Sequence, residues 1–138
     1  MALVCDTGPL IAVVDRGDEE HERCASLFRE AHEGLRVPAP VLVELEYGLR
    51  HAVGVRAFPA VIDEIAGGGF RVEDLTPSDY MRVRELLETY ADLRVGYVDA
   101  AVLAVTERLG ERKLATLDHR HFTVMRPRHV EALELLPG

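Results

Sequence analysis

The chain has 138 residues, 48% of them hydrophobic, which suits one ordinary domain with a single core. It has only two cysteines and no apolar stretch near the length of a membrane span, so we expect a soluble cytoplasmic protein with no membrane partner and no disulfide framework. The formal net charge of −8 excludes a general nucleic-acid coat protein, but it allows an enzyme that reaches nucleic acid through a bound cation.

Short apolar runs and helical patterns alternate along the first half of the chain. Ala2–Cys5 predicts a buried strand, and Pro9 suits the first turn of a helix that continues to Val14. The elements predicted next are a helix from Glu19 to about His32, a strand at Leu35–Ala39, a helix at Val41–Arg50, a helix from about Val55 to Ala66 and a strand at Phe70–Glu73.

The second half continues the alternation. Thr76–Asp79 predicts a helix start, with threonine as the cap, proline at the first position and an acid three residues on. The apolar stripe of this helix is Val83, Leu86, Leu87, Tyr90 and Leu93. The elements predicted after it are a helix at Gly96–Gly110, a strand at Lys113–Leu117, a polar turn at His119–His121 and a short strand at Glu134–Leu136. The pattern predicts one α/β domain over residues 1–138 with a mostly parallel sheet.

Acidic residues follow two of the predicted strands. Asp6 ends the first strand, and Asp118 ends the strand at Lys113–Leu117. If these strands are parallel neighbours, both carboxylates project from the same edge, where ligands bind in open parallel sheets. Asp99 lies in the first turn of a helix that is otherwise apolar all round, where a charge is costly unless it is paired or metal-bound. Capping by Asp6 and a favourable helix-dipole contact of Asp99 are the alternatives.

Two glutamates compete for the same edge on the helix at Val41–Arg50. Glu44 lies one turn before Gly48, where we expect another backbone to approach closely, so Glu44 is the acid expected to face inward and Glu46 the solvated one. A solvated Glu44 is the alternative. Clustered carboxylates repel one another, and all-oxygen sites suit Mg²⁺ or Mn²⁺. Zinc spacings are absent from the sequence, and His119 and His121 are interpreted as surface residues of a turn.

Four segments together carry a family resemblance: Val4–Ala12, Val43–Gly48, Val98–Ala101 and Leu114–Phe122. In this order and spacing they resemble the PIN-domain family and, more narrowly, the VapC-type toxins of bacterial and archaeal toxin–antitoxin pairs. The resemblance implies a three-layer α/β/α PIN-like fold and a Mg²⁺- or Mn²⁺-dependent endoribonuclease that acts on RNA. It also implies a homodimer that is held silent by a small cognate antitoxin.

The resemblance also assigns roles to residues. It implies that the metal-binding and catalytic acids are Asp6, Glu44, Asp99 and Asp118, with supporting hydroxyls at Thr7 and Thr116. Some relatives carry another acid three residues before the third one, and here that position is Gly96. Separately, the acid-free stretch from His119 to Val130 contains Arg120, Arg126 and Arg128, which we interpret as RNA phosphate contacts, with a solvated loop as the alternative.

Four other functions share part of this sequence pattern. A free-standing PIN nuclease in RNA processing and a catalytically inactive PIN-like binding module both share the fold. A phosphatase of the haloacid dehalogenase type needs a second aspartate two residues after the first, and here that position is Gly8. A response-regulator receiver domain needs paired acids after the first strand, and this chain has none there.

Overall fold

The computed structural model describes residues 1–138 and contains a five-stranded sheet in the order β3-β2-β1-β4-β5. The strands are β1 (Ala2–Cys5), β2 (Gly34–Pro38), β3 (Arg71–Glu73), β4 (Lys113–Ala115) and β5 (Glu134–Leu136). Every pairing is parallel, which confirms the predicted α/β class. The expected neighbours β1 and β4 do pair, with Val4 opposite Leu114 and Cys5 opposite Ala115.

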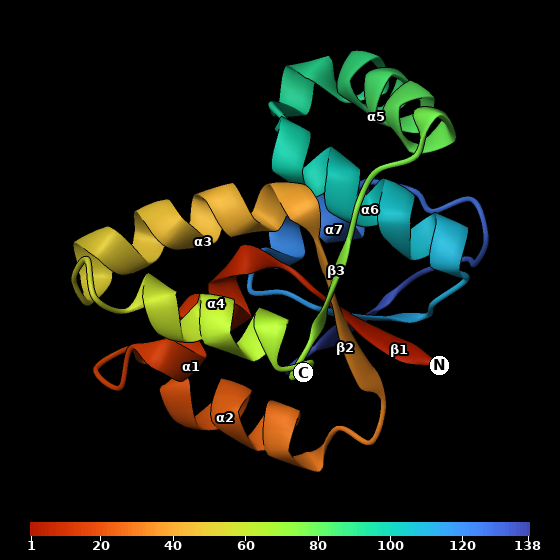
Figure 1. The fold of residues 1–138 in the computed structure, drawn as a ribbon. Helices are drawn as coiled ribbons and strands as arrows, with labels where there is room; N and C mark the ends of the chain where they lie inside the picture. The colour runs from red at the N-terminus through yellow and green to blue at the C-terminus, as the bar shows by residue number, and fades with distance from the viewer.

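Helices cover both faces of this sheet. They are α1 (Thr7–Val14), α2 (His21–Glu30), α3 (Ala39–Ala52), α4 (Phe58–Ala66), α5 (Pro77–Thr89), the 3₁₀ turn η1 (Ala91–Leu93), α6 (Tyr97–Leu109) and α7 (His119–Val124). The chain runs outward from β1 to β2 and β3, then crosses back to β4 and β5. Because parallel crossovers are right-handed, this reversal places later helices on the opposite face from earlier ones. Figure 1 shows α5, α6 and α7 above the sheet and α1 and α2 below it, which makes three layers.

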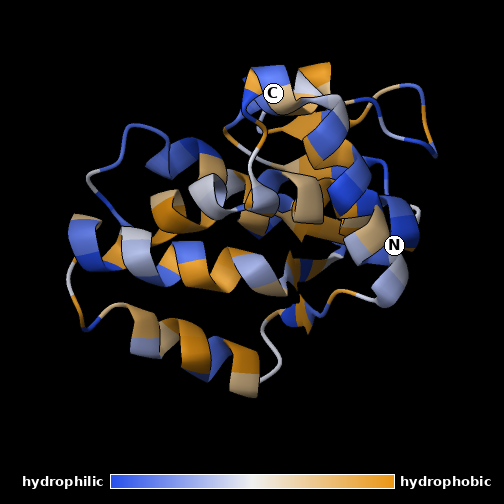
Figure 2. Cartoon of the chain, turned by 90° about the horizontal axis from the view of Figure 1, so that it is seen from above, coloured by the Kyte–Doolittle hydropathy of each residue, from blue (hydrophilic) through white to orange (hydrophobic).

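Helix α6 lies at the centre of the core. Every residue from Ala100 to Thr106 is buried, and the helix contacts β1 and β2 on one side and α5 on the other. The hydroxyl of Thr106 donates to the carbonyl of Val102 at 2.7 Å, so the polar side chain in this run is satisfied within its own helix. In Figure 2 the orange, hydrophobic stretches alternate with blue ones along the helices, as one-sided burial requires. None of the helices combines the length and the apolar character that a membrane crossing requires.

Several predicted boundaries differ from the structure. Helix α1 begins at Thr7, ahead of the predicted start at Pro9, and α4 begins at Phe58 instead of about Val55. Helix α5 ends at Thr89, so Leu93 leaves the predicted stripe and is 39% exposed in η1. Strand β4 ends at Ala115, two residues earlier than predicted, because the next side chain turns toward the sheet edge described below.

Two local predictions were wrong in kind. Residues 119–121 form the first turn of α7 and not a polar turn, because Asp118 caps this helix by accepting a hydrogen bond from the amide of His121. The close neighbour of Gly48 is the side chain of Ile11 from α1, which stands where a Cβ would lie, and not another backbone. The glycine therefore allows α1 and α3 to pack closely together.

Candidate functional site

Asp6 and Asp118 follow the two central strands at the carboxyl edge of the sheet. The chain leaves β1 toward β2 and leaves β4 toward β5, so the strand order reverses between β1 and β4. In open parallel sheets this reversal opens a crevice in which ligands bind. The amide of Asp6 donates to the carbonyl of Ala115 at 2.8 Å, which holds Asp6 beside the end of β4.

Asp6 is a buried carboxylate that does not cap the helix it precedes. It is 5% exposed and occupies the N-cap position of α1, but its side chain makes no cap hydrogen bond. Burial raises the pKa of Asp6 to about 6, with further contributions from the negative charges of Glu44 and Asp118. Hydrogen bonds from the Thr7 backbone and the Thr116 side chain oppose this rise in pKa without cancelling it.

Two threonine hydroxyls accompany these aspartates. The hydroxyl of Thr116 donates to Oδ2 of Asp6 at 2.8 Å and accepts from the amide of Asp118 at 3.0 Å, so one side chain connects both acids. The hydroxyl of Thr7, next to Asp6, is buried and has no hydrogen-bond partner. An unpaired buried hydroxyl costs about 1–3 kcal/mol, so this atom marks a place that suits a further ligand.

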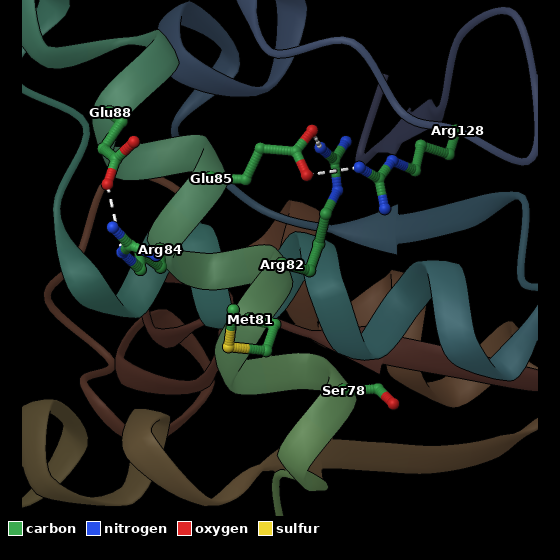
Figure 3. A pocket seen from close by; sticks show the side chains of 7 residues that line it. All are labelled: Ser78, Met81, Arg82, Arg84, Glu85, Glu88 and Arg128. Carbon is green, nitrogen blue, oxygen red and sulfur yellow. Dashed lines mark hydrogen bonds and ion pairs between the residues drawn. The ribbon is translucent and has the colours of Figure 1, made fainter.

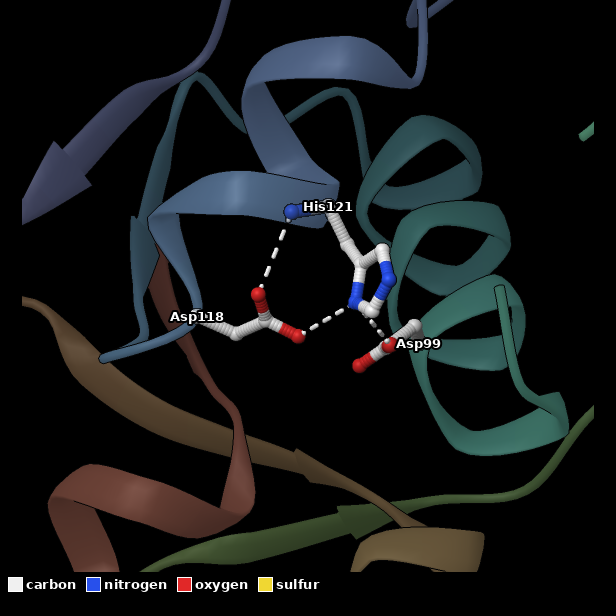
Figure 4. A group of neighbouring side chains, drawn as sticks. All are labelled: Asp99, Asp118 and His121. Atoms are coloured by element: carbon white, nitrogen blue, oxygen red, sulfur yellow. Dashed lines mark hydrogen bonds and ion pairs between the residues drawn. The ribbon is translucent and has the colours of Figure 1, made fainter. Parts of the chain in front are cut away.

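Asp99, Asp118 and His121 form a compact cluster (Figure 4). Nδ1 of His121 lies 2.8 Å from Oδ2 of Asp118 and 3.2 Å from Oδ2 of Asp99. The other oxygen of Asp118 accepts from the His121 amide at 3.1 Å, as the cap of α7. Nε2 of His121 lies 3.2 Å from the carbonyl oxygen of Leu93 in η1. The cluster therefore joins the starts of α6 and α7 to the turn before α6.

The charge of Glu44, the fourth acid, acts on the buried aspartates. Burial raises the pKa of Asp99 to about 7, and the charges of Asp6, Asp118 and Glu44 add to the rise while His121 opposes it. The hydrogen bond to Asp118 is the main reason that the pKa of His121 is raised, and the charge of Asp99 contributes as well. The prediction that Glu44 faces inward was wrong: its side chain is exposed, because Val41, Leu45 and Leu49 occupy the buried face of α3. Glu44 therefore lies at the rim of the site and acts on the buried acids through its charge.

Glu46, the competitor on α3, makes a different interaction. Both of its carboxylate oxygens accept from the guanidinium of Arg50 one turn later, with Nε to Oε2 at 2.9 Å. The pair lies on the solvent side of α3 and is about 40–50% exposed. Glu46 is therefore a surface partner of Arg50, but it is half-buried while Glu44 is exposed, so the structure reverses the predicted order of exposure of the two glutamates.

The donor set fits a hard divalent cation. One atom each from Asp99, Asp118 and His121 lies within 4.8 Å of the others, which a single ion can bridge. The raised pKa values of Asp6 and Asp99 show that the carboxylates cannot all stay ionised at low cost without an added positive charge. The unpaired hydroxyl of Thr7 supplies a further oxygen beside Asp6.

The three arginines after Asp118 have different surroundings. Arg120, on α7, and Arg126 have exposed side chains that form no ion pair. The guanidinium of Arg128 pairs with Glu85 on α5, and its amide donates to Glu107 at 2.8 Å. Figure 3 shows this pair beside Arg82 along one side of α5. The guanidinium groups of Arg120 and Arg126 are therefore free of ion pairs, whereas that of Arg128 is neutralised by Glu85.

His121 was missed as a site residue. Sequence reasoning placed His119 and His121 at the surface of a turn; His119 is exposed, but His121 contacts two of the acids. The signal was the spacing Asp118-x-x-His121, because a cap residue and the residue three positions later face each other at a helix start. Reading the segment as a turn concealed that relation.

Comparison with known proteins agrees with this geometry. The pattern of the family described as "PIN domain" matches residues 3–126. Ribonuclease VapC26 of Mycobacterium tuberculosis is 31% identical over 125 residues, which cover 91% of this chain and 93% of that protein. The chain belongs to the PIN-domain family. The resemblance inferred from the four sequence segments is therefore confirmed.

Solved structures share the fold of this PIN domain. VapC20 of Mycobacterium tuberculosis, described as a sarcin-ricin loop cleaving toxin, superposes with a TM-score of 0.82 at 22% identity, covering 94% of this chain and 98% of VapC20. VapBC2 of Rickettsia felis, bound to a promoter DNA fragment, gives a TM-score of 0.71 at 14% identity and 98% coverage of both chains. The expected PIN-like α/β architecture with a parallel central sheet is confirmed.

Proposed function

We propose that this PIN domain is a Mg²⁺- or Mn²⁺-dependent endoribonuclease and that it acts as the toxin of a type II toxin–antitoxin pair. The observation that carries the proposal is the convergence of Asp6, Asp99 and Asp118 at the switch point of the sheet, with Glu44 at the rim. Carboxylates whose pKa is raised in a crevice are candidates for catalytic work. The 31% identity to a named ribonuclease supports RNA as the substrate.

The proposed division of labour follows from burial. A bound divalent cation supplies Lewis acidity, which activates a water and offsets charge on the scissile phosphate. Asp99 and Asp118 would hold the cation, and the buried Asp6 would supply a further carboxylate, whose orientation Thr116 fixes. The free hydroxyl of Thr7 would be available to a water held by the cation. Glu44 would approach the cation from the solvent side.

We propose that the three arginines after Asp118 contact RNA phosphates, and we expect their contributions to binding to differ. Arg120 lies in the first turn of α7, two residues after the cap residue Asp118, and its side chain is exposed. The side chain of Arg126 is exposed. Its backbone is held in place, because its amide donates to the hydroxyl of Tyr90 at 2.9 Å. Arg128 reaches a phosphate only after it leaves Glu85. We therefore expect Arg120 and Arg126 to contribute more than Arg128.

Two surfaces suit the proposed protein partners. An apolar groove of about 340 Å³ is lined by residues of α1, α2, β2, α3 and α4 and by the segment before β3, among them Leu10, Phe28, Val61 and Phe70. It suits an apolar segment of the antitoxin. The solved complexes of similar fold include toxin–antitoxin assemblies, which supports such a partner.

A homodimer is proposed from a second surface. Helix α3 exposes Val43 and Tyr47 one turn apart, 76% and 62% exposed, and this stripe suits a second copy of the chain.

Both cysteines are unpaired, which fits the cytoplasm as the proposed location. We also propose that residues 1–138 form a single PIN domain, since β5 extends the same sheet beyond the residues that match the family pattern.

Two alternatives share the family. An inactive PIN-like binding module is favoured only by Gly96, where some relatives have an acid, because Asp6, Glu44, Asp99 and Asp118 are all present. A free-standing nuclease in RNA processing has the same chemistry and differs in lacking an antitoxin. RNA cleavage by the purified chain eliminates the first alternative, and a short adjoining reading frame that encodes a DNA-binding antitoxin eliminates the second.

Substitution of the buried acids tests the proposed enzyme. We expect Asp6→Asn and Asp99→Asn each to lower Mn²⁺- or Mg²⁺-dependent RNA cleavage by about 100-fold or more, because each removes a charge that holds the cation. Circular dichroism should show that both variants stay folded. Glu46→Gln is the matched control, since Glu46 pairs with Arg50 away from the crevice, and it should cleave like the wild type. A wild type that cuts no RNA with either metal would reject the proposal.

A further inference from the structure

The two ring nitrogens of His121 have chemically different partners. Nε2 lies 3.2 Å from the carbonyl oxygen of Leu93, and a carbonyl only accepts, so Nε2 carries a hydrogen. Nδ1 faces two carboxylate oxygens instead, one from Asp118 at 2.8 Å and one from Asp99 at 3.2 Å (Figure 4). With a hydrogen on Nδ1 these contacts are hydrogen bonds to the two carboxylates. When that hydrogen is lost, the lone pair of Nδ1 and the carboxylate oxygens repel one another unless a cation lies among them.

We propose that Nδ1 of His121 is a metal ligand that acts together with Asp99 and Asp118. This inference rests on the proposed metal-dependent function and adds a nitrogen donor to its ligand set. An octahedral ion with bonds of about 2.1 Å has neighbouring ligand atoms about 3.0 Å apart. The two separations from Nδ1, 2.8 and 3.2 Å, lie on either side of that length. Nδ1 therefore already has the spacing of an adjacent ligand to each of the two carboxylate oxygens, and the ligand atoms of the three residues all lie within 4.8 Å of one another.

The contact with Leu93 matches the arrangement that metal-binding histidines need. Such a histidine donates its other N–H to a carbonyl or a carboxylate, which fixes the tautomer and aims the free nitrogen at the ion. Leu93 ends the η1 turn and Arg94 follows in the left-handed region with φ of 54°, so the chain turns sharply there. The turn presents a backbone carbonyl to α7 across 28 residues of sequence.

Gly96 leaves the start of α6 without a side-chain ligand, and Nδ1 of His121 can take that role. Gly96 is the N-cap of α6, three residues before Asp99, and a Cβ at this position would meet nothing within 4 Å. The start of α6 thus offers no side-chain donor at that position, and His121 brings one from α7. Because imidazole nitrogen favours transition ions over Mg²⁺, the resulting two-oxygen, one-nitrogen set predicts a preference for Mn²⁺.

Pulsed electron paramagnetic resonance on the full chain with Mn²⁺ tests the assignment directly. We expect the electron spin echo of bound Mn²⁺ to show modulation from a directly coordinated ¹⁴N, and to change to the ¹⁵N pattern when the histidines are labelled with ¹⁵N. His121→Gln should lose the nitrogen coupling while still binding Mn²⁺. His119→Gln, a change at the exposed histidine two residues away, should keep the coupling.

Calorimetric titration gives a second readout that does not depend on RNA cleavage. We expect His121→Gln to weaken Mn²⁺ binding by about tenfold and Mg²⁺ binding by less than about threefold, with His119→Gln unchanged for both ions. Bound Mn²⁺ without nitrogen coupling in the wild type, or coupling that persists in His121→Gln, overturns the assignment and leaves the proposed nuclease intact. If the wild type binds neither metal, the proposed function fails as well. If His121→Gln does not fold, the labelled wild type and His119→Gln still decide the question.

Discussion

Two regions of this protein bury carboxylates, and they compensate them differently. Between α5 and α6, Asp79 is 3% exposed and accepts from Nε of Arg108 at 2.9 Å and from the amide of Thr76 at 2.9 Å. Glu107 on α6 accepts from two nitrogens of Arg82, at 2.8 and 3.0 Å. We call this region the α5–α6 network, and in it Asp79 and Glu107 each have a guanidinium in direct contact.

The edge of the sheet has no such cation. Asp6 is nearly as buried as Asp79, yet its side-chain partner is the neutral hydroxyl of Thr116. His121 is the basic side chain in contact with Asp99 and Asp118, and it is shared between them. Buried charges without compensation destabilise a fold, so their retention indicates that a cation belongs there. The comparison separates acids that stabilise the structure from acids that serve a site.

The largest expected effect comes from breaking the α5–α6 network. Asp79→Ala removes both the partner of Arg108 and the acid of the capping box at Thr76, so we expect a loss of about 3 kcal/mol in the free energy of unfolding. Urea denaturation monitored by circular dichroism measures it. Arg84→Gln is the control, since Arg84 forms an exposed pair with Glu88 one turn later, and it should cost less than about 0.5 kcal/mol. Equal effects of the two changes would contradict the distinction between the regions.

At the acidic edge, in contrast to the α5–α6 network, we expect neutralisation of the acids to stabilise the metal-free protein. Burial raises the pKa of Asp6 to about 6 and that of Asp99 to about 7, above the value of about 3.8 expected when unfolded. The folded chain therefore binds more protons than the unfolded chain in this range, so stability rises as the pH falls from 8 to 5. The raised pKa of His121 acts in the same direction, because protonated His121 is stabilised by Asp118 and Asp99.

Thermal unfolding in EDTA at pH 8 and pH 6 measures this trend. We expect the wild type to gain about 1 kcal/mol on going to pH 6, after allowance for solvent screening of Asp99. Asp99→Asn should raise stability at pH 8 and flatten the dependence. Saturating Mn²⁺ should stabilise the wild type more at pH 8 than at pH 6, since protons and the cation compete for the same acids. A wild type that is less stable at pH 6 in EDTA would count against unpaired acids at the edge.

A further expected effect concerns the hydroxyl that connects two acids. Thr116→Val removes the hydrogen bonds to Asp6 and from Asp118 with little change in volume, so we expect metal affinity to fall by about tenfold. Thr106→Val is the matched control, because Thr106 is equally buried but bonds only to Val102 within α6. Calorimetric titration of Mn²⁺ compares the two. A Thr116 variant that binds metal like the control would remove the supporting role of this hydroxyl.

Much of the fold was predictable because its signals are local. The capping box at Thr76–Asp79 formed as predicted, since four adjacent residues contain all of its donors and acceptors. The buried run in α6 and the short strand β1 followed from continuous apolar sequence, which has no stable alternative to burial. The pairing of β1 with β4 was expected only as a condition, and the structure supplies it.

The sequence by itself determined the alternation of strands and helices, and the positions of acids at their ends, because these depend on neighbouring residues. Tertiary structure alone decided which side chains meet. It joined Thr116 to Asp6 across 110 residues, turned His121 from an apparent surface residue into a partner of Asp99, and neutralised Arg128 with Glu85 across 43 residues. Such contacts depend on how the layers pack over the sheet, and packing is set by the whole chain at once.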